Sequence, residues 1–204
     1  MNRLFFPLGK YHSRYGQYVG WSFLSNIIVS LENAMASHSI LSAIDGTSEA
    51  LRTANYIGKD VLGQMGGLIY LARISQRIDQ SPRSFLLYSS IVQQTAFLAI
   101  YCTPLIPSSY FLPLAGGANI LANVAFAGFG AVNAKCVQRL AIDNNTGEIY
   151  AKVSLANTMG SSLGLLGGLG LVILLPDHSS RIALLPALAL LRGYTMQRAV
   201  ENLV

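Results

Sequence analysis

The chain has 204 residues and a net charge of +5, and Asp, Glu, Lys and Arg make up only 11% of it. An ordinary soluble domain carries roughly 25% of such residues, and the mean hydropathy here is +0.44. This composition argues against a soluble globular domain. The positive charges form no basic stripe with interleaved aromatic residues, which argues against nucleic-acid binding.

The N-terminal arm, residues 1–17, is poor in acidic residues. The first 31 residues contain Arg3, Lys10 and Arg14 but no Asp or Glu. Such a bias resembles an organellar targeting segment. The alternative is that these residues only form the positive end of the first helix.

Six helices are predicted in chain order, and together they form a single helical membrane domain at residues 18–204. They cover residues 18–42, 47–78, 83–103, 114–142, 148–175 and 181–202. Turn residues such as Asp45-Gly46 and Asn144-Asn145 separate them. No run of alternating β-branched residues predicts a strand.

Two long segments of these helices have no charged residue. Residues 84–134 and 153–176 contain no Asp, Glu, Lys, Arg or His. Because a spanning helix needs about 20 mostly apolar residues, the first segment holds two spans and the second holds one. We therefore expect an all-α fold, a polytopic transmembrane bundle of about 4–6 membrane helices.

The distribution of charge supports a topology in which all six helices cross. Residues 73–83 and 135–152 would lie on one side, and they hold six Lys or Arg against three acidic residues. The opposite loops carry almost no Lys or Arg, which follows the positive-inside rule. The first helix, with Glu32 and His38, and the sixth, interrupted by Pro186, are the weakest spans and could instead lie along the interface.

Glycines recur every four residues in two of the predicted helices. Such a stripe leaves one helix face smooth and lets another backbone approach closely. We expect the helices 47–78 and 148–175 to form the tightest pair. A phosphate-binding loop would need a preceding strand and a Gly-Lys-Ser/Thr ending, and neither is present. The predicted packing residues are Gly63, Gly67, Gly160, Gly164 and Gly168.

The charges within the second helix form the first candidate polar site. Lys59 and Asp60 point about 100° apart on a helix, so we expect each to find its partner one turn away. Asn55 suits Lys59, and Tyr56 or Gln64 suits Asp60. An intramembrane charge is by default a hypothesis of function. A structural ion pair is the alternative, and the one we favour.

Glu148 and Lys152 are the other candidates for a polar site. They stand four residues apart in the acid-first order, at the start of a helix, which by itself explains them as a helix-terminal pair. Lys135 and Arg139 join them as the expected distant partners of the charges at 59 and 60.

The remaining reactive side chains predict neither a metal site nor catalysis. The histidines lack metal-ligand spacing, and Asp177, His178 and Ser179 are neighbours in a turn, which is not the geometry of a catalytic triad. Cys102 and Cys136 are expected to be small buried hydrophobes. We expect no cofactor, no metal and no enzymatic activity.

Four stretches together resemble the root UV-B sensitive family, plant and animal proteins with a membrane-associated domain of unknown function. The order and spacing of the stretches agree over residues 6–170. The stretches are Phe6-Pro7 with Gly9, Lys59-Asp60-x-x-Gly63-x-x-Gly66, Pro107-Ser108-Ser109-Tyr110-Phe111-Leu112, and Asn145-Thr146-Gly147-Glu148-Ile149-Tyr150-Ala151-Lys152.

The resemblance implies a location in an organelle membrane, either plastid or mitochondrial. In plants the family is linked to light responses and vitamin B6 homeostasis, and no reaction is established for it. This chain departs from the family pattern after Lys152 and at Gly66-Gly67, where the family often has Gly-Arg. It also ends at Val204, so we expect a short form without the family's C-terminal region and without any activity that depends on it.

Two functions remain. The preferred one is a non-catalytic accessory subunit of a large, respiratory-type complex in the mitochondrial inner membrane, with membrane lipids and other membrane subunits as partners. The alternative is a small-solute carrier or permease, related to vitamin B6 through the resemblance, with the polar residues of the second helix as its site. Discontinuous helices or an internal repeat would favour a carrier, but no convincing repeat is present.

Overall fold

The computed structural model describes residues 2–78, 81–201 and 203, and it is built from helices. Six long helices correspond to the six predicted ones, and the all-α prediction is confirmed. A short helix, α1, precedes them, and two 3₁₀ turns join α4 to α5. The bounds are α1 Asn2–Phe5, α2 Tyr15–Ala43, α3 Glu49–Ile78, α4 Pro82–Tyr101, η1 Thr103–Leu105, η2 Ser108–Tyr110, α5 Phe111–Leu140, α6 Thr146–Leu174 and α7 His178–Val200.

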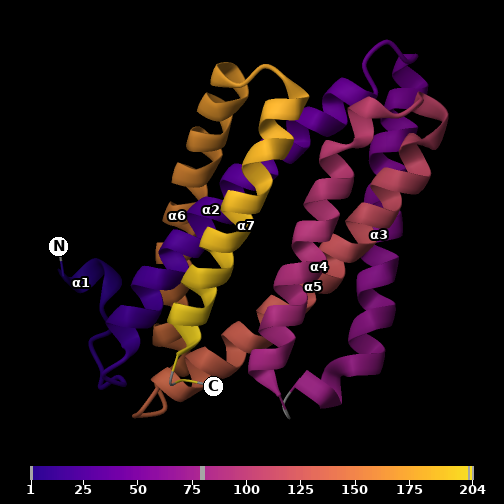
Figure 1. The fold of residues 1–204 in the computed structure, drawn as a ribbon. Helices are drawn as coiled ribbons and strands as arrows, with labels where there is room; N and C mark the ends of the chain where they lie inside the picture. The colour runs from indigo at the N-terminus through magenta and orange to yellow at the C-terminus, as the bar shows by residue number, and fades with distance from the viewer. Residues whose placement is uncertain (1, 79–80, 202, 204) are drawn as a thin grey trace.

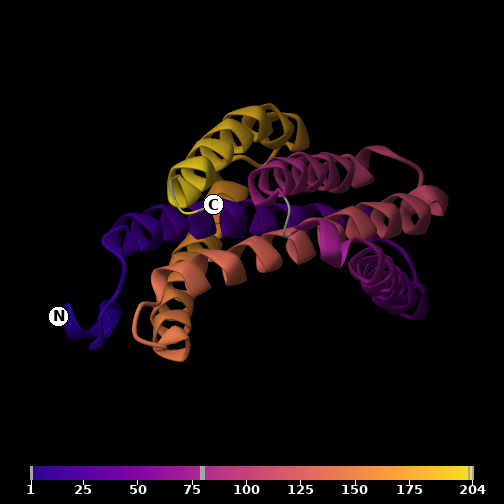
Figure 2. The same ribbon diagram turned by 90° about the horizontal axis from the view of Figure 1, so that it is seen from below.

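The long helices form two groups of three (Figure 1). Helix α2 packs against α6 and α7, and α5 packs against α3 and α4. Contacts of α4 with α7 and α2 join the two groups. Seen from below, α7 and α4 lie on one side of the molecule and α3 on the other (Figure 2). This arrangement leaves an interface between the groups that contains the cavity described below.

Helix α2 begins and α7 ends at the same end of the bundle (Figure 1). Helices α3 and α5 end there, and α4 and α6 begin there, so the positively charged segments of the sequence gather at this end. Asp79, one of the acidic residues counted in the topology prediction, lies outside the described residues. The turns at Gly46 and Asn144 both adopt positive φ, 81° and 59°, a conformation that glycine and asparagine tolerate best.

Three helical stretches are long and apolar enough to cross a membrane: Pro82–Leu105, Ser108–Leu140 and Thr146–Leu174. In the described part of the chain, α2, α3 and α7 do not reach that standard, so the count is smaller than the predicted range. The difference arises because Glu32 and several Ser and Asn residues lower the mean hydropathy of α2, three arginines lower that of α7, and α3 is amphipathic, with Lys59 and Asp60 in its middle.

Helix α6 is built with small residues inside and large apolar residues outside. Its buried face carries Ala156 and three glycines, whereas Leu166 and Ile173 are 67% and 71% exposed. Soluble monomers rarely expose a large continuous apolar surface. Close helix packing through small residues is instead typical of helices in lipid.

The glycine stripe of α6 lies against the backbone of α2. A Cβ at Gly160 or Gly168 would come within 2.7 Å of the carbonyl oxygen of Phe23 or Leu31, and a Cβ at Gly164 would come closer still to that of Ile27. Since real Cβ atoms do not approach this closely, a larger residue would push the two helices apart.

The predicted pairing of residues 47–78 with 148–175 is wrong. Helix α3 packs mainly against α5, and α6 packs against α2. A Cβ at Gly63 would lie 2.7 Å from Nδ2 of Asn123, and one at Gly67 would lie 3.1 Å from Cβ of the same asparagine. A glycine stripe predicts that a helix has a close neighbour, but it carries no information about which neighbour.

Replacing Gly164 by valine is expected to destabilise the protein. The added side chain overlaps the α2 backbone, and overpacking of this kind costs about 1–3 kcal/mol. Thermal unfolding in mild detergent measures the loss. Gly170→Val on the same helix is the matched control, because nothing lies within 4 Å of its added Cβ. Equal melting temperatures of the two variants would contradict the close approach of α6 to α2.

Candidate functional site

The predicted polar residues of α3 lie at its contact with α5. Lys59 is buried, its Nζ donates a hydrogen bond to Oδ1 of Asp60 at 2.7 Å, and it lies 4.1 Å from the centroid of the Tyr56 ring. The expectation that Lys59 and Asp60 would find separate partners is therefore wrong. The long lysine side chain spans the roughly 100° between neighbouring helical positions, which Cα directions alone do not reveal.

Asn119 of α5 completes this arrangement. Its Nδ2 donates to the carbonyl oxygen of Lys59 at 2.9 Å and to Oδ1 of Asp60 at 3.0 Å. The distant partner is thus an amide on α5 and not one of the charged residues expected. Asn55 is half-buried and Gln64 is exposed, so the four predicted residues of α3 do not close around one enclosed space.

Glu148 holds the N-terminal arm. Its two carboxylate oxygens accept hydrogen bonds from the backbone N–H groups of Leu8 at 2.6 Å and Gly9 at 3.4 Å. Asn145 adds a hydrogen bond from its Nδ2 to the carbonyl oxygen of Lys10 at 3.0 Å. Glu148 therefore ties the arm to the start of α6. Lys152 lies half-buried one turn further along that helix.

A cavity of about 280 Å³, partly open to the surface, lies where α2, α5, α6 and α7 meet, and Leu86 of α4 also lines it. None of the residues predicted as a ligand site lines it. Its wall is mixed, with aromatic and aliphatic side chains beside a set of polar ones. The polar residues of the wall are Tyr18, Ser22, Ser25, Asn26, Asn133, Asn157 and Arg192.

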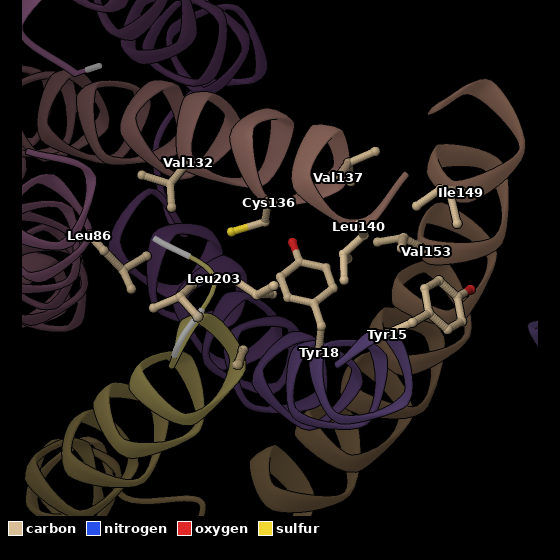
Figure 3. Close-up of a cluster of buried hydrophobic side chains, with 12 residues drawn as sticks. Tyr15, Tyr18, Leu86, Val132, Cys136, Val137, Leu140, Ile149, Val153 and Leu203 are labelled. Carbon is tan, nitrogen blue, oxygen red and sulfur yellow. The ribbon is translucent and has the colours of Figure 1, made fainter. Parts of the chain in front are cut away.

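Hydrogen bonds among these side chains tie three helices together around the cavity. Ser22 Oγ of α2 donates to Oδ1 of Asn157 on α6 at 2.9 Å, and the Tyr18 hydroxyl donates to Oδ1 of Asn133 on α5. Figure 3 shows the Tyr18 ring packed between Cys136 and Leu140, with its oxygen directed toward α5. Polar and apolar contacts thus alternate on the same wall.

A buried ion pair lies on the α7 side of the cavity, with Arg192 in the cavity wall. Arg192 is 3% exposed and Glu32 is 0% exposed, and Nη1 of the arginine lies 3.8 Å from Oε2 of the glutamate. Gln94 Nε2 donates to both oxygens of Glu32, at 3.1 and 3.3 Å. The guanidinium carbon of Arg192 lies 4.8 Å from the centroid of the Phe129 ring.

The Arg192 guanidinium has hydrogen-bond donors that no described residue accepts. Its Nε and Nη1 are buried, and neither has a hydrogen-bond partner among the described residues. A buried donor left without an acceptor costs about 1–3 kcal/mol, and more when it is charged. Since Arg192 also lines the cavity, an acceptor that enters the cavity would relieve that cost. Chemically, the site is suited to a small molecule with an anionic group.

The sequence prediction missed this site, although its signals were visible. Glu32 weakens the first predicted helix as a membrane span, and Arg192 lies in the sixth predicted helix. Both are charges inside otherwise apolar helices, which marks functional sites in membrane proteins. Nothing in the linear sequence shows that residues 160 positions apart are partners.

A second buried arginine lies at the opposite end of α7. Arg181 is 1% exposed, its Nη1 is 2.6 Å from Nδ1 of His38, and the rings of His38 and His178 are 6.3 Å apart. Burial, and then the nearby guanidinium, lower the pKa of the His178 imidazole. Among the described residues no three His, Cys, Asp or Glu side chains are grouped to hold a metal ion.

The fold and the cavity define an all-helical protein with a polar site and three helices able to span a membrane by length and composition. Residues 2–204 match the family described as "Vitamin B6 photo-protection and homoeostasis domain", and the chain belongs to this family. The family resemblance inferred from the sequence motifs is thereby confirmed.

Three relatives from Arabidopsis thaliana illustrate the match. The protein named root UVB sensitive 4 is 29% identical over 182 residues, which cover 87% of this chain and 35% of the relative. Root UVB sensitive 5 is 28% identical over 181 residues, with 83% and 35% covered, and root UVB sensitive 3 is 26% identical over 176 residues, with 79% and 39% covered. The chain thus spans little more than a third of these relatives. No solved structure matches it.

Two of the motifs that carried the resemblance meet in the structure, and a third contacts α5. The segment around Gly9 lies against Asn145 and Glu148, and a Cβ at Gly9 would lie 2.7 Å from Nδ2 of Asn145. The segment around Gly63 lies against the asparagines of α5, through Asn119. These contacts therefore act in helix packing and in fixing the arm, and they lie outside the cavity wall.

Replacing Glu148 by alanine is expected to release the N-terminal arm. Hydrogen bonds to a charged group contribute about 1.5–3 kcal/mol, so trypsin should cleave after Lys10 and Arg14 about tenfold faster or more. Limited proteolysis followed by mass spectrometry measures the rate. Glu49→Ala, which alters an exposed glutamate at the start of α3, is the control. Identical cleavage rates would show that the arm is held by other contacts.

Proposed function

We propose that the protein is a polytopic membrane protein that carries a small anionic molecule through the cavity beside Arg192, with phosphorylated forms of vitamin B6 as the first candidates. The proposed process is binding and release without a chemical step, so the protein is not an enzyme. The observation that carries the proposal is the buried guanidinium of Arg192, which lines a partly open cavity and has two nitrogens without hydrogen-bond partners in the described chain.

The distribution of side chains supports the membrane part of the proposal. Three helical stretches meet the length and hydropathy of a span, and α6 directs its glycines inward and its leucines outward. In lipid, exposed leucine has no cost, and small residues at helix contacts are favourable. The remaining long helices run beside these three (Figure 1).

The position of the cavity supports the carrier part. It lies between the group α2, α6, α7 and the group α3, α4, α5, and carriers commonly bind their solutes at the interface of two helix bundles. Its volume of about 280 Å³ is just below the usual range for small-molecule pockets, roughly 300–1,000 Å³. The space suits one small ring with a polar group attached.

The chemistry of the wall supports a B6 vitamer, the ligand class that the family description names. A phosphate would be bound by Arg192, because the planar guanidinium forms paired hydrogen bonds to phosphate. Phe129 offers an aromatic face to a pyridine ring, and Asn133 or Asn157 offers hydrogen bonds to its polar substituents. No lysine is among the described residues of the wall, so the aldehyde form would be held without a covalent bond, and borohydride should not attach it.

We expect Glu32→Gln to strengthen binding of pyridoxal 5′-phosphate, and the double variant Glu32→Gln with Arg192→Gln to weaken it about 10- to 100-fold. The first change frees Arg192 from its carboxylate, and the second removes the cation. The double variant is preferred to Arg192→Gln alone, because an unpaired buried Glu32 would cost about 3–5 kcal/mol and could unfold the protein. Since Glu32→Gln leaves Arg192 unpaired in the same way, thermal unfolding must show that this variant is folded.

Binding can be followed by quenching of the single tryptophan. Trp21 precedes Ser22 of the cavity wall and packs edge-on against Tyr194, and pyridoxal phosphate absorbs where indole emits. Arg52→Gln, an exposed arginine at the other end of the bundle, is the control. Saturable quenching that is equal in all variants would place the ligand elsewhere, and no saturable quenching in the unaltered protein would reject the vitamer.

The accessory-subunit function is the second candidate, and one observation favours it. Helix α3 packs mainly against α5 and exposes a row of large apolar residues that could contact another membrane subunit. These residues are Ile57, Val61, Leu68 and Ile69. The proposed location is an organelle membrane, with the mitochondrial inner membrane preferred and the plastid as the alternative, and it is supported by the family resemblance alone.

Purification in mild detergent tests this second candidate. If the protein is an accessory subunit, it should migrate with a large electron-transport complex, and Leu68→Lys on the outer face of α3 should release it. Leu190→Lys, on the exposed face of α7, is the matched control. A monomer or small homo-oligomer in the unaltered protein would exclude the accessory role and leave the carrier proposal unaffected.

A further inference from the structure

A groove opens between α4 and α7 at the end of the bundle where α4 begins and α7 ends. It has a volume of about 590 Å³, twice that of the cavity. Its floor is apolar, and Arg83 and Arg198 stand at its sides. The proposed site beside Arg192 does not use this groove.

Three side chains line both the groove and the cavity: Leu86, Met196 and Val200. A side chain that borders two spaces is the partition between them. The groove and the cavity therefore adjoin at these three residues. If one of the three moves, the two spaces become continuous.

Of these three side chains, Met196 is the one best able to change conformation. Leu86 and Val200 are buried in the packed cluster at this end of the bundle, whereas Met196 is only half-buried at its edge. Its side chain is unbranched and has three rotatable bonds. The contact that holds it across the groove is weak, a hydrogen bond from Ser90 Oγ of α4 to its sulfur at 3.6 Å.

The charges of the groove suit an anion. Arg198 is paired with Glu201, the only acidic residue among the described lining, at 2.7 Å, and Arg83 is exposed at the mouth, so the groove keeps a net positive charge. Arg192 is the next cation inward, on the cavity side of the partition. A positively charged cleft raises the local concentration of anions and speeds their entry.

We propose that the groove between α4 and α7 is the entrance through which an anionic small molecule reaches the cavity, and that Met196 is the side chain that gates it. The identity of the ligand rests on the proposed function, but the route does not. The entrance lies at the end of the bundle where α4 begins and α7 ends. Arg83 attracts the anion to the groove, a change in the Met196 side-chain conformation lets it pass, and Arg192 binds it.

Cys136 allows the route to be tested without any vitamer. It is a free thiol on the cavity wall, and the chain has one other cysteine, Cys102. In a Cys102→Ser background, the negatively charged reagent 2-sulfonatoethyl methanethiosulfonate modifies Cys136 alone, and intact-mass spectrometry gives the rate. We expect Met196→Phe to slow this modification about tenfold or more by filling the partition, which is a barrier increase of about 1.4 kcal/mol.

Two control variants separate blocking and charge effects from general damage. Leu190→Phe adds the same ring to α7 at a side chain that is 77% exposed, and it should leave the rate unchanged. Arg83→Gln should slow the anionic reagent severalfold but not the neutral methyl methanethiosulfonate, whereas Arg52→Gln should change neither rate. Thermal unfolding confirms that each variant is folded.

Equal rates for Met196→Phe and Leu190→Phe would overturn the entrance, since the reagent would then reach Cys136 by another path. So would an equal effect of Arg83→Gln on both reagents. If vesicles or micelles with an anionic phospholipid protect Cys136 while Met196→Phe has no effect, the groove is a lipid site and the proposal is wrong. If the labelling results are as expected but pyridoxal phosphate does not bind, the entrance stands and the vitamer is rejected, so the two failures are distinguishable.

Discussion

The buried pair of Glu32 and Arg192 is the interaction on which the rest of this structure depends. Glu32 accepts hydrogen bonds from α4 at its side chain and, through the Tyr101 hydroxyl, at its backbone carbonyl oxygen, and it faces α7 through Arg192. Three helices from both groups therefore converge on one carboxylate. A buried ion pair gives little net stability compared with apolar packing, but the loss of either partner leaves an uncompensated buried charge, so the arrangement of these helices depends on both being present.

Around this pair, the helices are held together by close approach of their backbones and by hydrogen bonds from asparagine side chains. The glycines of α6 let α2 come near, and those of α3 make room for the asparagines of α5. In lipid the hydrophobic effect does not drive helices together, so packing and interhelical hydrogen bonds must do so. The motifs that carry the family resemblance contribute to these contacts. The polar residues of the cavity wall lie outside those motifs.

The sequence predicted the helices well and the site poorly. Helix ends could be placed from turn residues such as Gly46 and Asn144, because left-handed conformations are a local property. Lys59 and Asp60 can be recognised as a candidate site because their charges are adjacent in the chain. Glu32 and Arg192 each stood alone, and a lone charge in an apolar helix gains meaning only when its partner is known.

The amino-acid sequence by itself determined the all-α class, the six long helices, the family and the glycine faces, since each follows from local periodicity or from short motifs. The tertiary structure alone decided that α6 packs on α2, that Glu32 faces Arg192, and that a polar cavity lies between the two helix groups. The physical reason is that helix propensity and hydropathy act within a few turns of the chain, whereas cavities and buried ion pairs arise from complementary surfaces of helices that are distant in sequence.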